Sequence, residues 1–122
     1  MDKESIVAGF KTALLWLNDE SLDNDVFSPS SEQWIHNVVT EFIADTKLDA
    51  IFHEFTHTSA EHSLSEQIGY DLYFTVSDCG VGFWDNCRDN IYNGHGDTLS
   101  TACETVTINN IWTTSKNLIE IE

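Results

Sequence analysis

The stretch from Ile51 to His57 contains the His-Glu-x-x-His pattern of zinc peptidases. His53 and His57 are four residues apart, so a helix would place both imidazoles on one face, where they can bind Zn²⁺. Glu54 would then activate a metal-bound water, and Glu61, one turn further on, is the candidate third ligand. A zinc-dependent hydrolase is therefore one functional alternative.

The residues around this motif favour a different interpretation. An apolar stripe runs along the predicted helix through Leu48, Ile51, Phe52 and Phe55. This stripe centres almost opposite the two histidines, so they face water, whereas a catalytic zinc needs a partly dry cleft. The longer pattern H-E-x-x-H-x-x-G-x-x-H also fails, because Ala60 and Ser63 stand where glycine and a third histidine are required. We predict a solvated helix face without cofactor or catalysis, with zinc as the alternative.

Charge is the strongest compositional signal. The chain has 21 acidic residues against five Lys and Arg, for a net charge of -16. Such a chain should repel nucleic acid and anionic membranes, and no apolar run approaches the roughly 20 residues of a membrane span. Attraction to basic surfaces is expected instead, such as the DNA-handling face of another protein. The plain alternative is that the acidity only serves solubility.

Length and cysteine content limit the remaining classes. A chain of 122 residues suits one domain covering 1–122. The three cysteines, Cys79, Cys87 and Cys103, cannot all pair within the chain, and no C-x-x-C is present. Free thiols favour a reducing cytoplasm.

Hydrophobic periodicity predicts three helices in the first half of the chain. The first covers Asp2 to Leu17, with apolar residues at helical spacing. An acidic loop follows. The second helix is predicted to begin at a capping box formed by Ser30 and Gln33. The third runs from Leu48 to Ala60 and carries the His-Glu-x-x-His.

The second half is predicted to form a small sheet. Tyr70 to Val76 alternates apolar and polar residues, which is typical of a strand, and Val81 to Trp84 is predicted to pair with it as a hairpin. Asp97 is the predicted cap of a short helix. Two terminal strands are expected around Thr113–Asn117. The predicted fold is α+β, with N-terminal helices packed on a small antiparallel sheet and one short inserted helix.

The stretch from Gly69 to Asp85 reads GYDLYFTVSDCGVGFWD. It resembles the signature of a family of small uncharacterised phage-encoded proteins, which runs roughly G-H-D-F-W-L-T-R-N-G-H-G-A-G-F-W-D. The positions that match at unbroken spacing are Gly69, Asp71, Thr75, Gly80, Gly82, Phe83, Trp84 and Asp85. Tyr70 and Val76 replace the histidine and arginine of that pattern. The resemblance implies a phage origin and a place in the host-cell cytoplasm, but no particular activity.

The matching residues have a structural interpretation. Gly80 and Gly82 permit a tight turn and a close backbone approach. Phe83 and Trp84 are expected to anchor the hairpin to the helices. For Asp71, a hydrogen-bonding role at a strand edge is favoured over a functional carboxylate.

Small size, acidity and the phage resemblance together favour a protein that binds and inhibits a basic host protein. The expected target is a nucleic-acid-handling or anti-phage defence complex, reached by imitating DNA phosphates or by blocking an assembly interface. The candidate contacts are acidic residues of the first loop and third helix: Asp19, Glu20, Asp23, Asp25, Glu54 and Glu61. A virion accessory protein is a further alternative, and a homodimer stays open.

Overall fold

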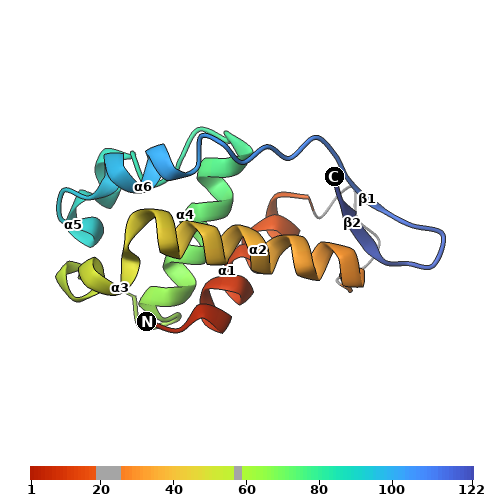
Figure 1. The fold of residues 1–122 in the computed structure, drawn as a ribbon, viewed down its shortest axis with the longest axis horizontal. Helices are drawn as coiled ribbons and strands as arrows, with labels where there is room; N and C mark the ends of the chain where they lie inside the picture. Colours follow the sequence, from red (N-terminus) through yellow and green to blue (C-terminus); the bar gives the residue numbers. More distant parts are fainter. Residues whose placement is uncertain (19–25, 57–58) are drawn as a thin grey trace.

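The structure, a computed structural model, describes residues 1–18, 26–56 and 59–122. These segments form a mostly helical fold with one small antiparallel sheet, which confirms the predicted α+β class (Figure 1). In chain order the elements are α1 (Lys3–Leu17), α2 (Pro29–Thr46), α3 (Leu48–Ile51), η1 (Phe52–Glu54), α4 (Leu64–Ser77), η2 (Asn86–Arg88), α5 (Asp89–Tyr92), α6 (Gly96–Ala102), β1 (Ile111–Thr113) and β2 (Ile119–Ile121).

The helix predicted over Asp2 to Leu17 is confirmed as α1. Its backbone lies close to the backbone of α4 where the two helices cross. Asp2 caps α1 by accepting a hydrogen bond from the Glu4 N–H. A methyl group on Gly69 would lie 2.1 Å from the carbonyl oxygen of Ile6, and one on Gly9 would lie 2.2 Å from that of Glu66. Any larger residue at either position would push the two helices apart.

The second helix begins earlier than predicted. Its N-cap is Ser28, whose side chain accepts from the Ser31 N–H at 3.1 Å, so the cap predicted at Ser30 is wrong. Pro29 explains the shift, because proline is preorganised for the first helical position. Ser30 lies inside the first turn, and its hydroxyl donates to the carboxylate of Glu120.

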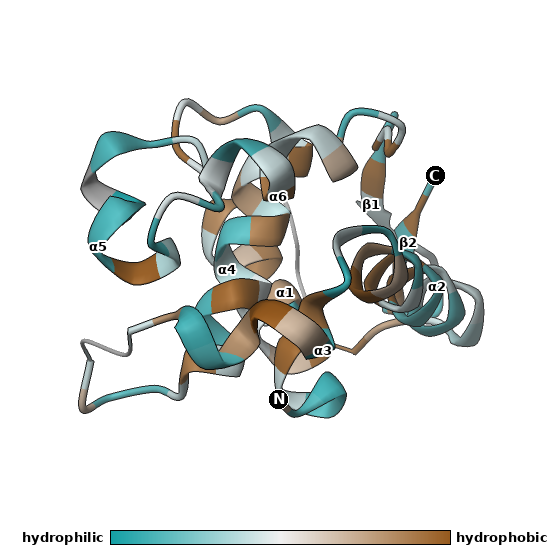
Figure 2. Ribbon diagram, turned by 60° about the vertical axis from the view of Figure 1, so that its left-hand side comes forward, coloured by the Kyte–Doolittle hydropathy of each residue, from teal (hydrophilic) through white to brown (hydrophobic). Residues whose placement is uncertain are grey.

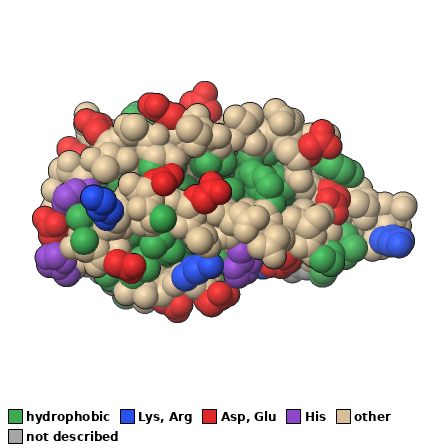
Figure 3. Space-filling view, in the orientation of Figure 1, with side chains coloured by type: hydrophobic (Ala, Val, Ile, Leu, Met, Phe, Trp, Pro, Cys, Tyr) green, Lys and Arg blue, Asp and Glu red, His purple; other side chains and the backbone are tan. Residues whose placement is uncertain are grey.

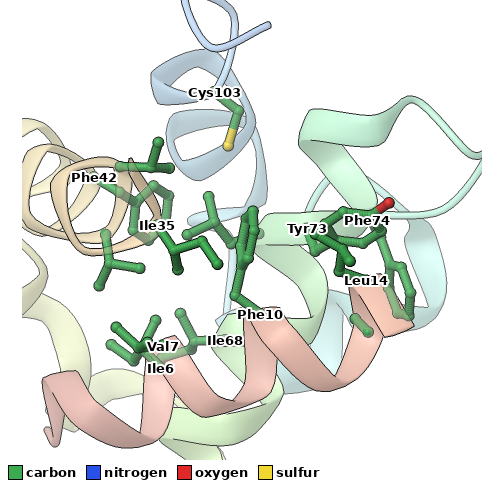
Figure 4. Packing of buried hydrophobic residues seen from close by; sticks show 14 of the residues in the cluster. Ile6, Val7, Phe10, Leu14, Ile35, Phe42, Ile68, Tyr73, Phe74 and Cys103 are labelled. Carbon is green, nitrogen blue, oxygen red and sulfur yellow. The ribbon is translucent and has the colours of Figure 1, made fainter. Parts of the chain in front are cut away.

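The core lies where α1, α2 and α4 meet. Ile6, Phe10, Leu14, Ile35, Leu72 and Leu99 are among its fully buried side chains. Figure 4 shows side chains of α1 and α2 pointing into one space with Ile68 of α4 and Cys103, which follows α6. In Figure 2 the hydrophobic residues of these helices gather toward the middle of the molecule. This core gives a fixed position to α4, which carries the first part of residues 69–85, the signature segment that resembles the phage-encoded family.

The C-terminal hairpin is confirmed. β1 and β2 pair antiparallel, with Trp112 opposite Glu120. Ile119 also forms a parallel bridge with Phe27, and the Ile121 N–H donates to Ser31 Oγ at 2.9 Å. These contacts attach the sheet to the beginning of α2. No helix within residues 1–18, 26–56 and 59–122 is long and apolar enough to cross a membrane.

The short inserted helix is present as α6, but its predicted cap is wrong. His95 occupies the N-cap position without a side-chain hydrogen bond, and Asp97 lies in the first turn. A carboxylate in the first turn still interacts favourably with the positive end of the helix dipole.

Candidate functional site

The His-Glu-x-x-His does not lie on a continuous helix. The helix predicted from Leu48 to Ala60 ends as the single turn of η1 at Glu54, and Phe55 is extended, with φ -84° and ψ 150°. The prediction failed because Phe55 is drawn into the core, where its ring meets Tyr92 edge-on at 5.2 Å. The next residue is fixed as well, since the Thr56 N–H donates to the Ile91 carbonyl at 2.8 Å.

The helical turn that carries His53 and Glu54 therefore ends before the rest of the motif. His53, Glu54 and Glu61 are all exposed, and His57 lies outside the described residues. The Glu54 carboxylate is 3.4 Å from Nε2 of His95. The described part of the chain holds no group of three or more His, Cys, Asp or Glu side chains that could bind a metal ion.

Replacing His53 and His57 with alanine is expected to leave both stability and metal content unchanged. His53 is exposed, and surface substitutions usually change the free energy of unfolding by less than about 0.5 kcal/mol. Thermal melting and metal analysis of protein purified without a histidine tag measure both quantities, with His36→Ala as the control. Stoichiometric zinc that disappears in the double variant would contradict this interpretation.

The signature segment begins on a helix rather than a strand. Residues 64–77 form α4, so the predicted hairpin of Tyr70–Val76 with Val81–Trp84 is wrong. Ser63 accepts from the Glu66 N–H while the Glu66 side chain accepts from the Ser63 N–H, which is a complete capping box. This cap and the packing on α1 outweigh the β propensity of the aromatic residues in the segment.

Asp71 is the centre of a buried polar network. Its carboxylate is fully buried and accepts three hydrogen bonds: from Arg88 Nε at 3.0 Å, Gln67 Nε2 at 3.0 Å and the Tyr92 hydroxyl at 2.5 Å. Burial, together with the charge of Asp71, raises the pKa of Tyr92 well above its usual value, so this phenol stays a donor. The network ties α4 to η2 and α5, and the predicted strand-edge role of Asp71 is wrong.

The network reaches the surface through His62. The Gln67 amide donates to Asp71, and its carbonyl oxygen faces His62 Nε2 at 2.6 Å. A carbonyl oxygen can only accept, so His62 must donate from Nε2. Nδ1 of His62 lies 3.2 Å from the Ser59 hydroxyl. The loop before α4 is thereby held to the buried carboxylate.

Other signature residues fold the chain back onto α4. The Thr75 hydroxyl donates to the Asp71 carbonyl at 2.7 Å and accepts from the Phe83 N–H at 3.1 Å. A methyl group on Gly82 would lie 2.4 Å from that hydroxyl oxygen, which explains the glycine. Phe83 is buried, but Trp84 is 49% exposed, so the expectation that both anchor this segment holds for Phe83 alone.

No protein-family model, curated protein or solved structure matches this chain. The resemblance to the phage-encoded family therefore stays a prediction that rests on residues 69–85. The contacts of Gly69, Asp71, Thr75, Gly82 and Phe83 give these matching residues structural roles, so the segment itself does not indicate a reaction.

A pocket of about 320 Å³ opens between α1 and α4. It is lined by Thr12, Ala13, Trp16, Gln67, Tyr70, Phe74 and Arg88. Trp16 forms one wall and is 70% exposed, with its ring centre 6.2 Å from that of Phe74. The buried network reaches the same pocket through Gln67 and Arg88. The pocket was not predicted from the sequence. The available signal was Trp16, which lies off the apolar stripe of the first helix and could have been recognised as an exposed aromatic residue.

The two cysteines whose side chains are described, Cys79 and Cys103, lie in different environments. Cys103 is buried, and burial raises the pKa of its thiol to about 12, so it stays protonated at neutral pH. Cys79 is exposed in the turn after α4, and its Sγ lies 3.6 Å from the Phe74 carbonyl oxygen. The hydrogen bonds of both thiols within the described part of the chain go to backbone carbonyl oxygens and not to a basic side chain that would activate a thiolate.

The acidic side chains lie overwhelmingly on the surface. Asp19, Glu20, Asp23 and Asp25 fall outside the described residues, so their predicted contacts are not placed. Of the other acidic residues, only Asp71 is buried. Figure 3 shows carboxylates spread over one face, around a hollow where hydrophobic side chains are visible.

Two of the five cationic side chains are already engaged. Lys11 pairs with Glu32 at 2.5 Å, and Arg88 pairs with Asp71 at 3.0 Å. Little positive charge is left to offset the surface carboxylates, so the molecule presents a strongly negative exterior.

Proposed function

We propose that this protein acts by binding a basic host protein and inhibiting it, and not by catalysis. The best candidates for the partner are nucleic-acid-handling or anti-phage defence complexes, whose working surfaces carry the positive charge that an acidic protein needs. The phage resemblance of residues 69–85 supports a host target.

The observation that carries the proposal is where the charge lies. A net charge of -16 would mean little if the carboxylates were paired or buried. Instead, the only buried acidic residue described is Asp71, and it is matched by Arg88. A surface of this kind produces a long-range negative field that speeds encounter with a basic partner.

Two modes of inhibition fit this surface. In the first, carboxylates take the places of DNA phosphates on the partner, so DNA competes for the same site. In the second, the protein covers a subunit interface, so DNA does not compete and the partner's assembly state changes. Competition by duplex DNA, followed by a measurement of the partner's mass in solution, separates the two.

The association rate is expected to fall as salt rises. The Debye length shrinks from about 30 Å at 0.01 M salt to about 3 Å at 1 M, so steering should be lost over this range. The partner is first isolated from host lysate on the immobilised protein at low salt and identified by mass spectrometry. Association and dissociation rates are then measured by surface plasmon resonance, and we expect an association rate at least about tenfold lower at high salt.

Two sets of charge reversals separate steering from contact. The first replaces Asp19, Glu20, Asp23 and Asp25 with lysine; the control set replaces the exposed residues Asp45, Asp49, Asp97 and Glu104. Both sets change the net charge equally, so both should slow association. Only a set that touches the partner should also speed dissociation. If neither salt nor either set of charge reversals changes the binding rates, the electrostatic basis of the proposal is removed.

A further inference from the structure

The pocket between α1 and α4 combines features that are uncommon on one small surface. Trp16 is the most exposed of the large hydrophobic side chains described, yet its ring is held against Phe74. The pocket volume of about 320 Å³ is at the lower end of the 300–1,000 Å³ typical of ligand sites. Aromatic walls with a few convergent polar groups are also typical of such sites.

We propose that this pocket receives an uncharged apolar side chain, such as leucine, methionine or phenylalanine, from a basic segment of the partner protein. The inference rests on the proposed function. It adds which surface of the protein binds the partner and what kind of side chain that surface receives. Trp16 would be the central contact, since tryptophan is enriched among the interface residues that dominate binding energy.

Charge determines which side chain can enter. Arg88 forms part of the wall, and Asp71 already compensates its charge; none of the described residues that line the pocket is an Asp or Glu that could pair with an entering lysine or arginine. The acidic exterior, in contrast, favours lysine and arginine on either side of the entering residue. An apolar residue flanked by basic ones satisfies both conditions.

The polar groups of the pocket suit a peptide. Inserting a side chain brings its backbone to the rim, where carbonyl oxygens need donors. Gln67 lines the pocket beside Arg88 and is oriented by its hydrogen bond to Asp71. Tyr70 brings a phenolic hydroxyl, and burial raises the pKa of this group, so it also stays protonated at neutral pH.

Three short peptides test the proposal by nuclear magnetic resonance titration of the isotope-labelled protein. The first has a central leucine flanked by lysines, the second replaces the leucine with glutamine, and the third keeps the leucine but replaces the lysines with serines. We expect the first to bind about tenfold more tightly than the second, because one buried aliphatic side chain is worth at least that factor. The first should also bind more tightly than the third at low salt, because only its lysines are attracted to the acidic exterior. The largest shifts should fall on the Trp16 indole and on Gln67 and Tyr70.

Two variants block the pocket in different ways, and a third is the control. Trp16→Ala removes a wall, and Thr12→Trp fills the mouth while Trp16 is kept; each should remove the preference for leucine over glutamine. Trp84→Ala removes an exposed tryptophan that does not line the pocket and should keep that preference.

The outcomes separate this inference from the proposed function. If both lysine peptides bind equally, in a salt-dependent way and without shifts at Trp16, the pocket proposal is overturned while electrostatic partner binding survives. Equal binding of the serine and lysine peptides that contain leucine would overturn the basic flanks and with them the charge argument. Free N-acetyl-leucine amide that binds as tightly as the first peptide would show a small-molecule site instead. No binding of any basic peptide at low salt counts against both.

Discussion

Truncation of Phe83 to alanine is expected to lower the free energy of unfolding by about 3–5 kcal/mol. The side chain is 1% exposed. Its ring stacks on Phe42 at 5.4 Å and meets Tyr92 edge-on at 5.1 Å, so truncation would leave a cavity beside these two aromatic rings. Equilibrium denaturation in urea measures the loss.

The neighbouring tryptophan is the matched control. Trp84 is adjacent in sequence but 49% exposed, and Trp84→Ala should cost less than about 1 kcal/mol. A larger loss for Trp84 than for Phe83 would contradict the assignment of the anchor to Phe83. If Trp84→Ala folds normally but loses partner binding, Trp84 is a second contact residue.

Replacing Asp71 with alanine is expected to destabilise the fold by about 3 kcal/mol. Removing one member of a buried ion pair typically costs 3–5 kcal/mol, because the other charge is left without compensation. The lower figure applies here because the Arg88 side chain is 21% exposed and can reach water. The Tyr92 hydroxyl and the Gln67 amide also lose their acceptor. Denaturation in urea again measures the effect.

A double variant shows whether the cost comes from the unpaired charge. Asp71→Ala with Arg88→Ala should recover part of the loss, with a coupling energy of about 0.5–3 kcal/mol. Asp45→Ala removes an exposed carboxylate of α2 and should cost nearly nothing. Strictly additive single losses would show that Asp71 and Arg88 do not stabilise each other.

The first helix and the last strand were predictable from the sequence, because α1 buries one face and β2 alternates between buried and half-buried residues. The segment Asp71–Phe74 was not: its alternation of apolar and polar residues predicts a strand, but all four residues are buried, the polar ones included. The sequence did contain the deciding signal, since Ser63 and Glu66 have the spacing of a capping box.

The buried network shows a different limit of prediction. Gln67 and Asp71 are four residues apart and would have been paired once the helix was recognised. Arg88 and Tyr92 reach Asp71 only because the intervening turn folds back through Thr75 and Gly82. Which of two adjacent aromatics, Phe83 or Trp84, turns inward likewise depends on that tertiary path and not on local pattern.

The hydrogen bond from the Ile121 N–H to Ser31 Oγ links β2 to the first turn of α2, so the two segments are expected to unfold together. An isolated two-stranded sheet is only marginally stable in water. β2 therefore depends on Ser31 and on the bridge between Phe27 and Ile119 for its persistence. Ser31 in turn is positioned by the Ser28 cap. Local opening at the start of α2 would consequently release the hairpin as well, although the two segments are separated by most of the chain.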